Sequence, residues 1–167
     1  ITPVSIASGK TLSGAITVTA GSIKLDETGT LASTVEMSGG TLDADESLTI
    51  SGALTQSGDT TIDVLDNKTL TYSGAPLSLG ANTLTMSGGG TFYNSYNLTL
   101  SAESILKLDG IGKVEKVSVS DNLSDGFLDV NQNVTIQTFS QQKSSRIDIA
   151  DGKSLTLTDA FEVPADQ

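Results

Sequence analysis

The stretch LTISGALTQSGDTTIDVLDNKTLTY, residues 48–72, contains one full period of the pattern that decides the fold. It begins with the triplet Leu48-Thr49-Ile50 and ends with the near copy Leu70-Thr71-Tyr72, with Ile62-Asp63-Val64 between them. In each triplet two apolar residues flank a polar one, as expected for a short strand with one buried face. Small residues and glycines such as Ser51-Gly52 separate the triplets, and they are typical of tight corners.

The same triplets return in three interleaved columns, whose order never changes along the chain. The first column contains 48–50, 70–72, 92–93, Val114, 134–136 and 155–157; the second contains 23–25, Leu42, 62–64, 84–86, 106–108, 128–130 and 147–149; the third contains 16–18, 35–37, Leu54, 77–79, 98–100, 117–119, Phe139 and 161–163. The repeat is about 19 residues near the start and about 22 later, a period typical of solenoids. A sandwich has no need of turns at such regular intervals, whereas a coil must keep its turn length nearly constant.

The sequence therefore predicts an all-β fold, a single parallel β-solenoid with about three short strands per coil and about eight coils. We expect residues 1–167 to form one continuous solenoid domain, because the pattern runs from Val4-Ser5-Ile6 to Phe161-Glu162-Val163. Since neither end shows a cap, we also expect the chain to be a fragment of a longer repeat protein. Two stretches with few apolar residues, Asp109–Lys116 and Ser140–Arg146, are expected to protrude as loops.

Composition narrows the classes of function. The chain has 20 acidic and 9 basic residues, a net charge of −11, and neither cysteine nor histidine. This charge disfavours binding to nucleic acid or to anionic membranes. No apolar run approaches the roughly 20 residues needed to span a membrane. Without histidine the chain lacks the commonest general base and metal ligand, and we expect no catalytic residue, cofactor or metal site.

Several phrases resemble the β-strand repeats of bacterial autotransporter and haemagglutinin-type adhesin passengers. They are residues 6–12 (IASGKTL), 48–58 (LTISGALTQSG), 64–71 (VLDNKTLT) and 149–156 (IADGKSLT). The resemblance implies a right-handed coil, secreted and held at or beyond the bacterial cell surface as a stalk or an adhesive surface. Its partners would be a host or matrix glycan or protein, or copies of the same chain. The expected function is therefore a structural or adhesive module that binds through its faces or stacks end to end.

Exposed aromatic side chains are the candidate ligand contacts. The cluster Phe92-Tyr93-Asn94-Ser95-Tyr96 is the one place where rings gather in the sequence. One ring is expected to face inward, and Tyr93 and Tyr96 are possible ligand contacts, although packing would also account for them.

Two alternatives remain open. A polysaccharide lyase or hydrolase would use acidic residues such as Asp63, Asp129 and Asp148, which the pattern places outward in one column, but Thr85 and Lys107 interrupt that column. A solvated charged face explains these acids better, and a strand with a polar corner explains the calcium-like run Asp129–Asn133.

The second alternative is an ice-binding solenoid, which needs outward threonine pairs in register. Thr71 and Thr85 are too close in sequence to share a face, and Tyr93 and Val114 interrupt the best row, so we expect no face to keep threonines in register.

Overall fold

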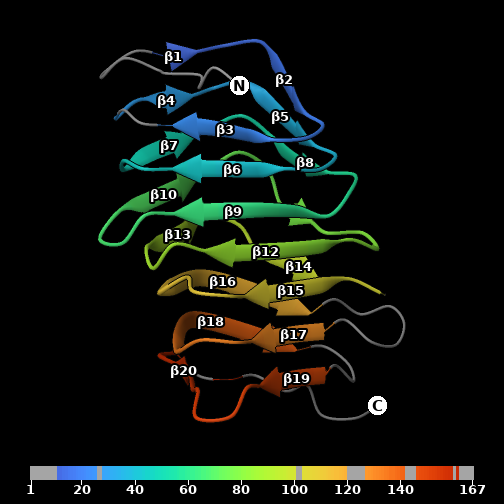
Figure 1. Ribbon diagram of the computed structural model, residues 1–167, viewed down its shortest axis with the longest axis vertical. Helices are drawn as coiled ribbons and strands as arrows, with labels where there is room; N and C mark the ends of the chain where they lie inside the picture. The colour runs from blue at the N-terminus through green and yellow to red at the C-terminus, as the bar shows by residue number, and fades with distance from the viewer. Residues whose placement is uncertain are drawn as a thin grey trace.

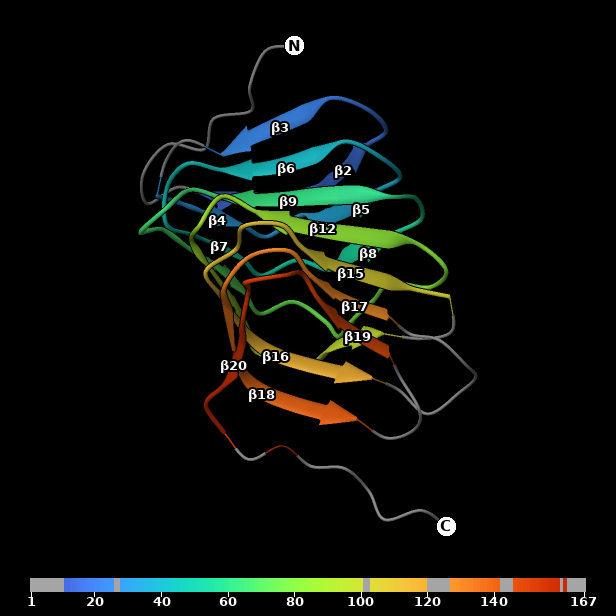
Figure 2. The ribbon, with the colours of Figure 1, turned by 60° about the horizontal axis from the view of Figure 1, so that its bottom comes forward.

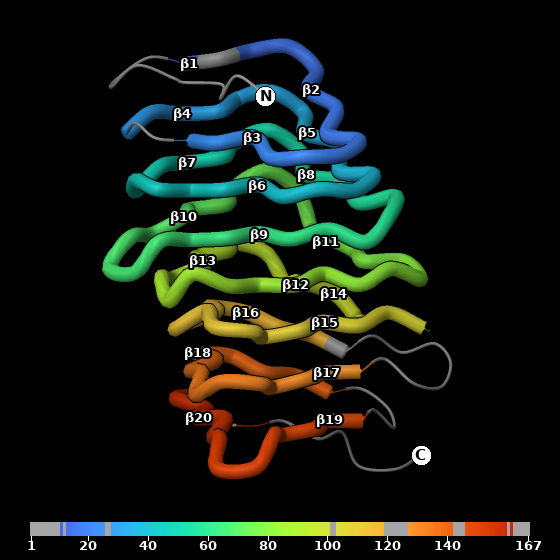
Figure 3. Tube along the Cα trace, in the orientation of Figure 1, coloured from blue at the N-terminus to red at the C-terminus, as the bar shows by residue number. Residues whose placement is uncertain are grey.

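The computed structural model is an all-β coil, and it describes residues 11–25, 28–100, 103–119, 127–141, 146–159 and 161. The chain winds turn after turn along one axis, so that strands of successive turns lie on one another (Figures 1 and 3). Every ladder between two strands of the described ranges is parallel. The predicted parallel β-solenoid is therefore confirmed, and the described residues contain no helix.

Three faces surround the core, as the view in Figure 2 shows. The first face, sheet A, contains β1 (Thr11–Leu12), β4 (Thr30–Leu31), β7 (Leu48–Ile50), β10 (Thr69–Tyr72), β13 (Thr91–Asn94), β16 (Lys113–Val119), β18 (Val134–Gln141) and β20 (Leu155–Leu157). The second face, sheet C, contains β3 (Ser22–Leu25), β6 (Thr41–Ala44), β9 (Thr60–Val64), β12 (Thr83–Ser87), β15 (Ile105–Leu108), β17 (Phe127–Val130) and β19 (Arg146–Ile149).

The third face has two parts. Sheet B contains β2 (Ala15–Val18), β5 (Thr34–Met37) and β8 (Leu54–Gln56), and below it lie β11 (Leu77–Ser78) and β14 (Leu98–Leu100). In the last turns β16 and β18 are long enough to cover both the first and the third face. The turns are thus β1–β3, β4–β6, β7–β9, β10–β12, β13–β15, β16–β17 and β18–β19, and β20 begins the next. The described residues therefore complete fewer turns than the roughly eight coils expected.

The core consists of aliphatic rows that run along the axis. Each strand buries alternate residues, so that parallel pairing places the buried residue of one turn over that of the next. One row of sheet A contains Leu48, Leu70, Phe92, Val114, Ile136 and Leu157. A row of sheet C contains Leu84, Leu106, Leu128 and Ile147. Dispersion contacts and burial along these rows stabilise the coil.

The row of sheet A from Leu48 to Leu157 differs from the predicted first column in its last two turns. The predicted column began its lower triplets with Val134 and Leu155, but Val114 pairs with Ile136, and Ile136 pairs with Leu157. Val134 and Leu155 therefore belong to the same strands but lie one inward position earlier. The triplet pattern identifies strands, whereas backbone pairing sets the residue register.

Turn length changes between β9 and β12. Leu48 pairs with Leu70, 22 residues later, whereas Ile62 pairs with Met86, 24 residues later. The segment that connects sheet A to sheet C is therefore two residues longer in the turn β10–β12 than in the turn β7–β9. The third face absorbs the extra residues, because the ladder of sheet B ends at β8.

The phenol of Tyr72 fills the gap in that ladder. Its side chain is 1% exposed, and its Oη accepts hydrogen bonds from the backbone N–H of Leu54 at 3.0 Å and of Ala75 at 3.1 Å. Without this oxygen the buried N–H of Leu54 would lose its partner. A side chain thus replaces a strand where two turns of unequal length meet.

The two expected loops have different outcomes. The prediction for Asp109–Lys116 was wrong: Ile111 and Val114 are fully buried and β16 begins at Lys113. Gly112 allows this path, because its N–H donates to Gly90 O at 2.9 Å and a Cβ there would meet Gly89 O at 2.5 Å.

In the second expected loop, Ser140 and Gln141 belong to β18 and Arg146 begins β19, whereas residues 142–145 lie outside the described residues. The triplets expected at Val4–Ile6 and at Glu162–Val163 also lie outside them, as does most of the phrase at 6–12. Among the described residues, no segment forms a helix that could cross a membrane.

Candidate functional site

The two candidate contact tyrosines are exposed. Tyr93 points outward from β13 and is 41% exposed, and Tyr96 lies at the following corner and is 48% exposed. Phe92 is fully buried and stacks on Tyr72, with 6.3 Å between ring centroids. The side chain of Asn94 is also buried, and it joins two turns by donating to Lys116 O at 2.6 Å and accepting from Lys116 N at 3.1 Å. One ring faces inward, as expected, and the two tyrosines are partly exposed on the surface.

The outward acids of sheet C fall into two rows, which corrects the single predicted column. Asp63 pairs with Asp43 above it and with Ser87 below it, whose hydroxyl donates to Asp63 Oδ2 at 2.5 Å. Asp129 and Asp148 belong to the neighbouring row. The longer turn before β12 separates the rows, since it places Ser87, and not Thr85, under Asp63. Within the described residues, no group of three or more acidic side chains could hold a metal ion.

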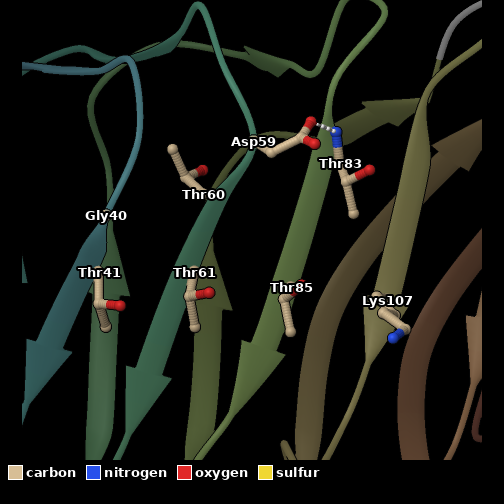
Figure 4. Close-up of a pocket in the computed structure, with 8 residues that line it drawn as sticks. All are labelled: Gly40, Thr41, Asp59, Thr60, Thr61, Thr83, Thr85 and Lys107. Carbon is tan, nitrogen blue, oxygen red and sulfur yellow. Dashed lines mark hydrogen bonds between the residues drawn. The ribbon is translucent and has the colours of Figure 1, made fainter. Parts of the chain in front are cut away.

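The neighbouring row of sheet C contains Ser22, Thr41, Thr61, Thr85, Lys107, Asp129 and Asp148. Across β6, β9, β12 and β15 this row forms the floor of a shallow groove with a volume of about 380 Å³ (Figure 4). The groove is lined by Gly40, Thr41, Asp59, Thr60, Thr61, Thr83, Thr85 and Lys107. We call this surface the threonine groove.

Small residues and a glycine corner hollow out the threonine groove. Gly40 has a φ of +79°, and a Cβ there would meet Gly21 O at 2.4 Å, so no side chain can fill this end. The corner before β9 is fixed by Gln56, whose Nε2 donates to Gly58 O at 3.0 Å and to Thr83 O at 2.7 Å. Asp59 Oδ1 accepts from the backbone N–H of Thr83 at 2.7 Å. The rim of the groove is therefore held in place by backbone and side-chain bonds between turns.

The groove carries one charged residue at its side and one at its end. Asp59 is exposed at the side, next to Thr83, and Lys107 lies at the end opposite Thr41, with its Nζ 3.5 Å from Asp109 Oδ2 (Figure 4).

Thr60 is only 5% exposed and shares the inward face of β9 with Ile62 and Val64, and its Oγ1 has no hydrogen-bond partner among the described residues. A buried hydroxyl without a partner costs about 1–3 kcal/mol, and this one lies in the interior behind the groove, where it pairs in register with Leu84.

Like charges crowd beside the groove. Asp43 pairs in register with Lys24 and Asp63, and Asp45 forms an ion pair with Lys24. Burial raises the pKa of Asp43 above its ordinary value; the carboxylates of Asp45 and Asp63 raise it further, and Lys24 opposes them. This part of sheet C therefore disfavours additional negative charge.

The run Asp129–Asn133 is a strand end and a corner, as expected. Asn131 Nδ2 donates to Asp109 Oδ1 at 2.7 Å, and Asn133 Oδ1 accepts from Ser154 N at 3.0 Å. The nitrogen of the Asn131 amide and the oxygen of the Asn133 amide thus connect one turn to the next.

Threonines are in register on sheet A, contrary to our expectation. Thr30 pairs with Thr49 and Thr49 with Thr71, and Thr69 pairs with Thr91 in the adjacent row. Tyr93 follows Thr71 and interrupts its row, as expected. The sequence comparison failed because it matched threonines of different faces, such as Thr71 and Thr85, and did not compare residues one turn apart on the same face.

Sequence reasoning did not identify the threonine groove. Its signals are small outward residues at 41, 61 and 85 together with the longer turn that brings Asp59 beside Thr83. Comparison with family models, with curated proteins and with solved structures found no match for the chain. The structure thus defines a β-solenoid, and the resemblance to adhesin passengers stays a prediction from the sequence.

Proposed function

We propose that the protein is a structural or adhesive β-solenoid module, secreted and held at the bacterial cell surface. The observation that carries the proposal is the continuous parallel ladder of sheets A and C, which displays outward side chains in rows along one stiff axis. A rigid array of this kind suits a stalk or a binding surface, since contacts made on several turns add up along the axis.

Partners of two kinds fit the surface. The net charge of −11 favours neutral or basic partners over nucleic acid and anionic lipid. Tyr93 and Tyr96 can stack on a sugar ring or on a side chain of a partner protein. A host or matrix glycan or protein is therefore one partner, and a second copy of the chain is the other.

The lower edge of sheet C supports association with a second copy. Ile147 and Ile149 continue buried core rows but are 37% and 44% exposed, and no described strand pairs with the outer edge of β19. An open strand edge with apolar side chains is a template for addition of another strand. Coil-on-coil stacking would bury these isoleucines and extend the rod.

Sedimentation velocity and negative-stain electron microscopy over a range of concentrations test this association. We expect species that lengthen with concentration, and Ile149→Lys is expected to abolish them by placing a charge in the contact. Thr156→Lys, at an exposed outward position of β20, is the matched control and should still associate. A strictly monomeric wild type that also fails to bind host-cell or matrix preparations would contradict the proposal.

Surface location is tested on intact cells of the source bacterium. An antibody raised against the purified protein is expected to label them without permeabilisation, and labelling only after lysis would overturn this part of the proposal.

The runner-up function is degradation of polysaccharides, and it predicts new chain ends. Purified protein is expected to release neither reducing nor unsaturated ends from acidic polysaccharides. Release of either kind of end would replace the proposed function with an enzymatic one.

A second candidate function has one observation in its favour, the in-register threonines, of which Thr30, Thr49 and Thr71 lie on sheet A and Thr41, Thr61 and Thr85 on sheet C. Outward hydroxyls at strand spacing, about 4.8 Å along the axis, can order water at an ice surface. Thermal hysteresis that disappears in Thr49→Tyr, but not in Thr99→Tyr on the third face, where the paired residues are Ser78 and Ser118, would support ice binding. Unchanged ice growth in the presence of the wild type would exclude it.

A further inference from the structure

We propose that the lower edge of the coil binds the lower edge of a second copy, so that two rods join tail to tail by antiparallel pairing of their β19 strands. The proposal rests on the association proposed above and names the surface on the second copy, the register and the size of the assembly. Among the described residues, β19 is the lowest strand of sheet C (Figure 1), and all four of its residues are exposed.

The backbone of β19 offers hydrogen-bonding groups at its outer edge. Just after the strand, Ala150 N donates to Val130 O of the preceding turn at 2.9 Å. Backbone groups of successive residues in a strand point to opposite sides, so those of Asp148 also face β17, and those of Ile147 and Ile149 face the outer edge. A strand added at this edge can therefore pair with these two isoleucines.

The side chains of β19 are complementary to their own copy in the antiparallel direction. When Ile147 of one copy lies opposite Ile147 of the other, their backbone groups exchange two hydrogen bonds. Arg146 of each copy then lies opposite Asp148 of the other on the outward face. Two opposite-charge pairs thus flank a two-fold axis, and one surface patch supplies both halves of the contact, as in any isologous interface.

Charge distinguishes this register from its neighbour. A shift that centres the contact on Asp148 would also bring edge-facing residues together, because it places Ile147 opposite Ile149. It would, however, set the two Asp148 carboxylates directly opposite each other, which is destabilising. Since each copy carries a net charge of −11, the register that pairs arginine with aspartate is favoured.

The inward side of the contact is apolar. Ile147 and Ile149 continue core rows but are 37% and 44% exposed. In the proposed register Ile147 meets its own copy, and Ile149 becomes a diagonal neighbour of Ile147 in the second copy. The contact therefore removes two isoleucines of each copy from water, which favours association.

Arg146 is held in position before a second copy arrives. Its guanidinium carbon lies 4.9 Å from the ring centroid of Phe127, and its Nη2 donates to Asp148 Oδ2 at 2.8 Å. A guanidinium donates several hydrogen bonds and a carboxylate accepts several, so both groups can also bond across the contact. Less side-chain freedom is then lost on association.

Sedimentation velocity and native mass spectrometry test the contact. We expect the wild type to form a two-copy species and nothing larger, because tail-to-tail pairing uses the lower edge of both copies. Asp148→Arg and Arg146→Glu each place like charges opposite each other twice in the dimer, and we expect each to raise the dissociation constant at least about tenfold. Asp66→Arg makes the same charge change as Asp148→Arg at the exposed corner between β9 and β10, and it should associate like the wild type.

An equal mixture of the two charge variants provides the sharpest measurement. In the mixed dimer every outward pair again joins an acidic and a basic side chain, so we expect association to return to within about tenfold of the wild type. Circular dichroism of each variant alone checks that it keeps the fold. A general loss of stability in β19 would not be repaired by mixing.

Three results would overturn the inference: a wild type that stays monomeric, assemblies that grow beyond two copies, and no recovery in a mixture of two folded variants. The first two are measured on the wild type and do not depend on the variants. Growth beyond two copies would support stacking through opposite ends and keep the proposed structural role, and a monomer that binds a glycan or protein would keep the adhesive one. Failure of this contact and failure of the proposed function can therefore be told apart.

Discussion

Single side chains hold turns of unequal length together, and Tyr72 is the clearest case. Its hydroxyl accepts the N–H groups of Leu54 and Ala75 where sheet B has no further strand. Removal of this oxygen therefore tests whether the stability of the coil depends on a side-chain acceptor where the backbone ladder ends.

Tyr72→Phe keeps the ring and removes the acceptor. We expect the free energy of unfolding to fall by about 1–3 kcal/mol, because the buried N–H of Leu54 is left without a partner. Urea denaturation measures this loss, and Tyr96→Phe, at a site 48% exposed, is the matched control with no expected effect. Equal stability of the two variants would show that Leu54 N–H has another acceptor.

Asp43 gives the coil a pH dependence at residue scale. Its pKa is raised in the folded protein by burial and by Asp45 and Asp63. The folded state therefore holds a proton more tightly than the unfolded state, and stability rises as the pH falls through the raised pKa toward the ordinary carboxyl value of about 4.

Asp43→Asn is accordingly expected to be more stable than the wild type at pH 7. The difference should shrink as the pH is lowered through the raised pKa, because the wild-type carboxyl then becomes neutral as well. Urea denaturation at several pH values measures both, and Asp151→Asn, at an exposed corner, controls for the loss of one negative charge. A difference that grows on acidification would contradict the expectation.

At the scale of elements, corners limit which residues the coil accepts. Gly52 lies so close to the corner of the preceding turn that a Cβ would meet Ser33 O at 1.8 Å and Ala32 O at 2.8 Å. Its neighbours are backbone atoms, which cannot move without displacing a strand. The requirement here is steric and does not depend on a positive φ.

Gly52→Ala is expected to destabilise the protein by about 3 kcal/mol, at the upper end of the usual cost of overpacking. Gly152→Ala provides the comparison, since nothing lies within 4 Å of a Cβ there and only its φ of +72° is unfavourable. We expect the second variant to lose about 1 kcal/mol. Thermal unfolding of the two proteins distinguishes them, and the reverse order would mean that the corners of Gly52 and Ser33 are not in contact.

Strands and their order could be predicted from the sequence, because alternation and period follow directly from side-chain burial. Ile62-Asp63-Val64 and Leu84-Thr85-Met86 were both placed in the correct column. Their register could not be predicted, since it depends on the longer segment after Tyr72. Ile111 was missed because its glycine neighbours hide it from a search for triplets.

The candidate site was less predictable for the same reason. The exposure of Tyr93 and Tyr96 follows from strand alternation and a corner, which a sequence reveals. The threonine groove needs Asp59 to lie beside Thr83, and that neighbourhood exists only with the two-residue step between β9 and β12. A surface formed by three-dimensional register leaves no motif in the chain.

For the whole molecule, the local stability of a turn depends on its position along the axis. In a solenoid each turn contacts only the turns on either side, so a central turn has two interfaces and an edge turn has one. Leu70, Tyr72 and Phe92 in the middle are 0–1% exposed, whereas all four residues of β19 are exposed.

Amide hydrogen exchange should therefore form a gradient along the rod. We expect the slowest exchange in β10, β12 and β13, whose opening requires loss of two interfaces, and faster exchange in β19, which can separate by losing one. Mass spectrometry of peptides from these strands measures the gradient in dilute protein. At concentrations where the wild type associates, β19 should become more protected while β12 stays the same, and Ile149→Lys should remove that change. Uniform protection along the axis would instead mean that the solenoid opens as one cooperative unit. The edge turn would then not separate from the rest on its own.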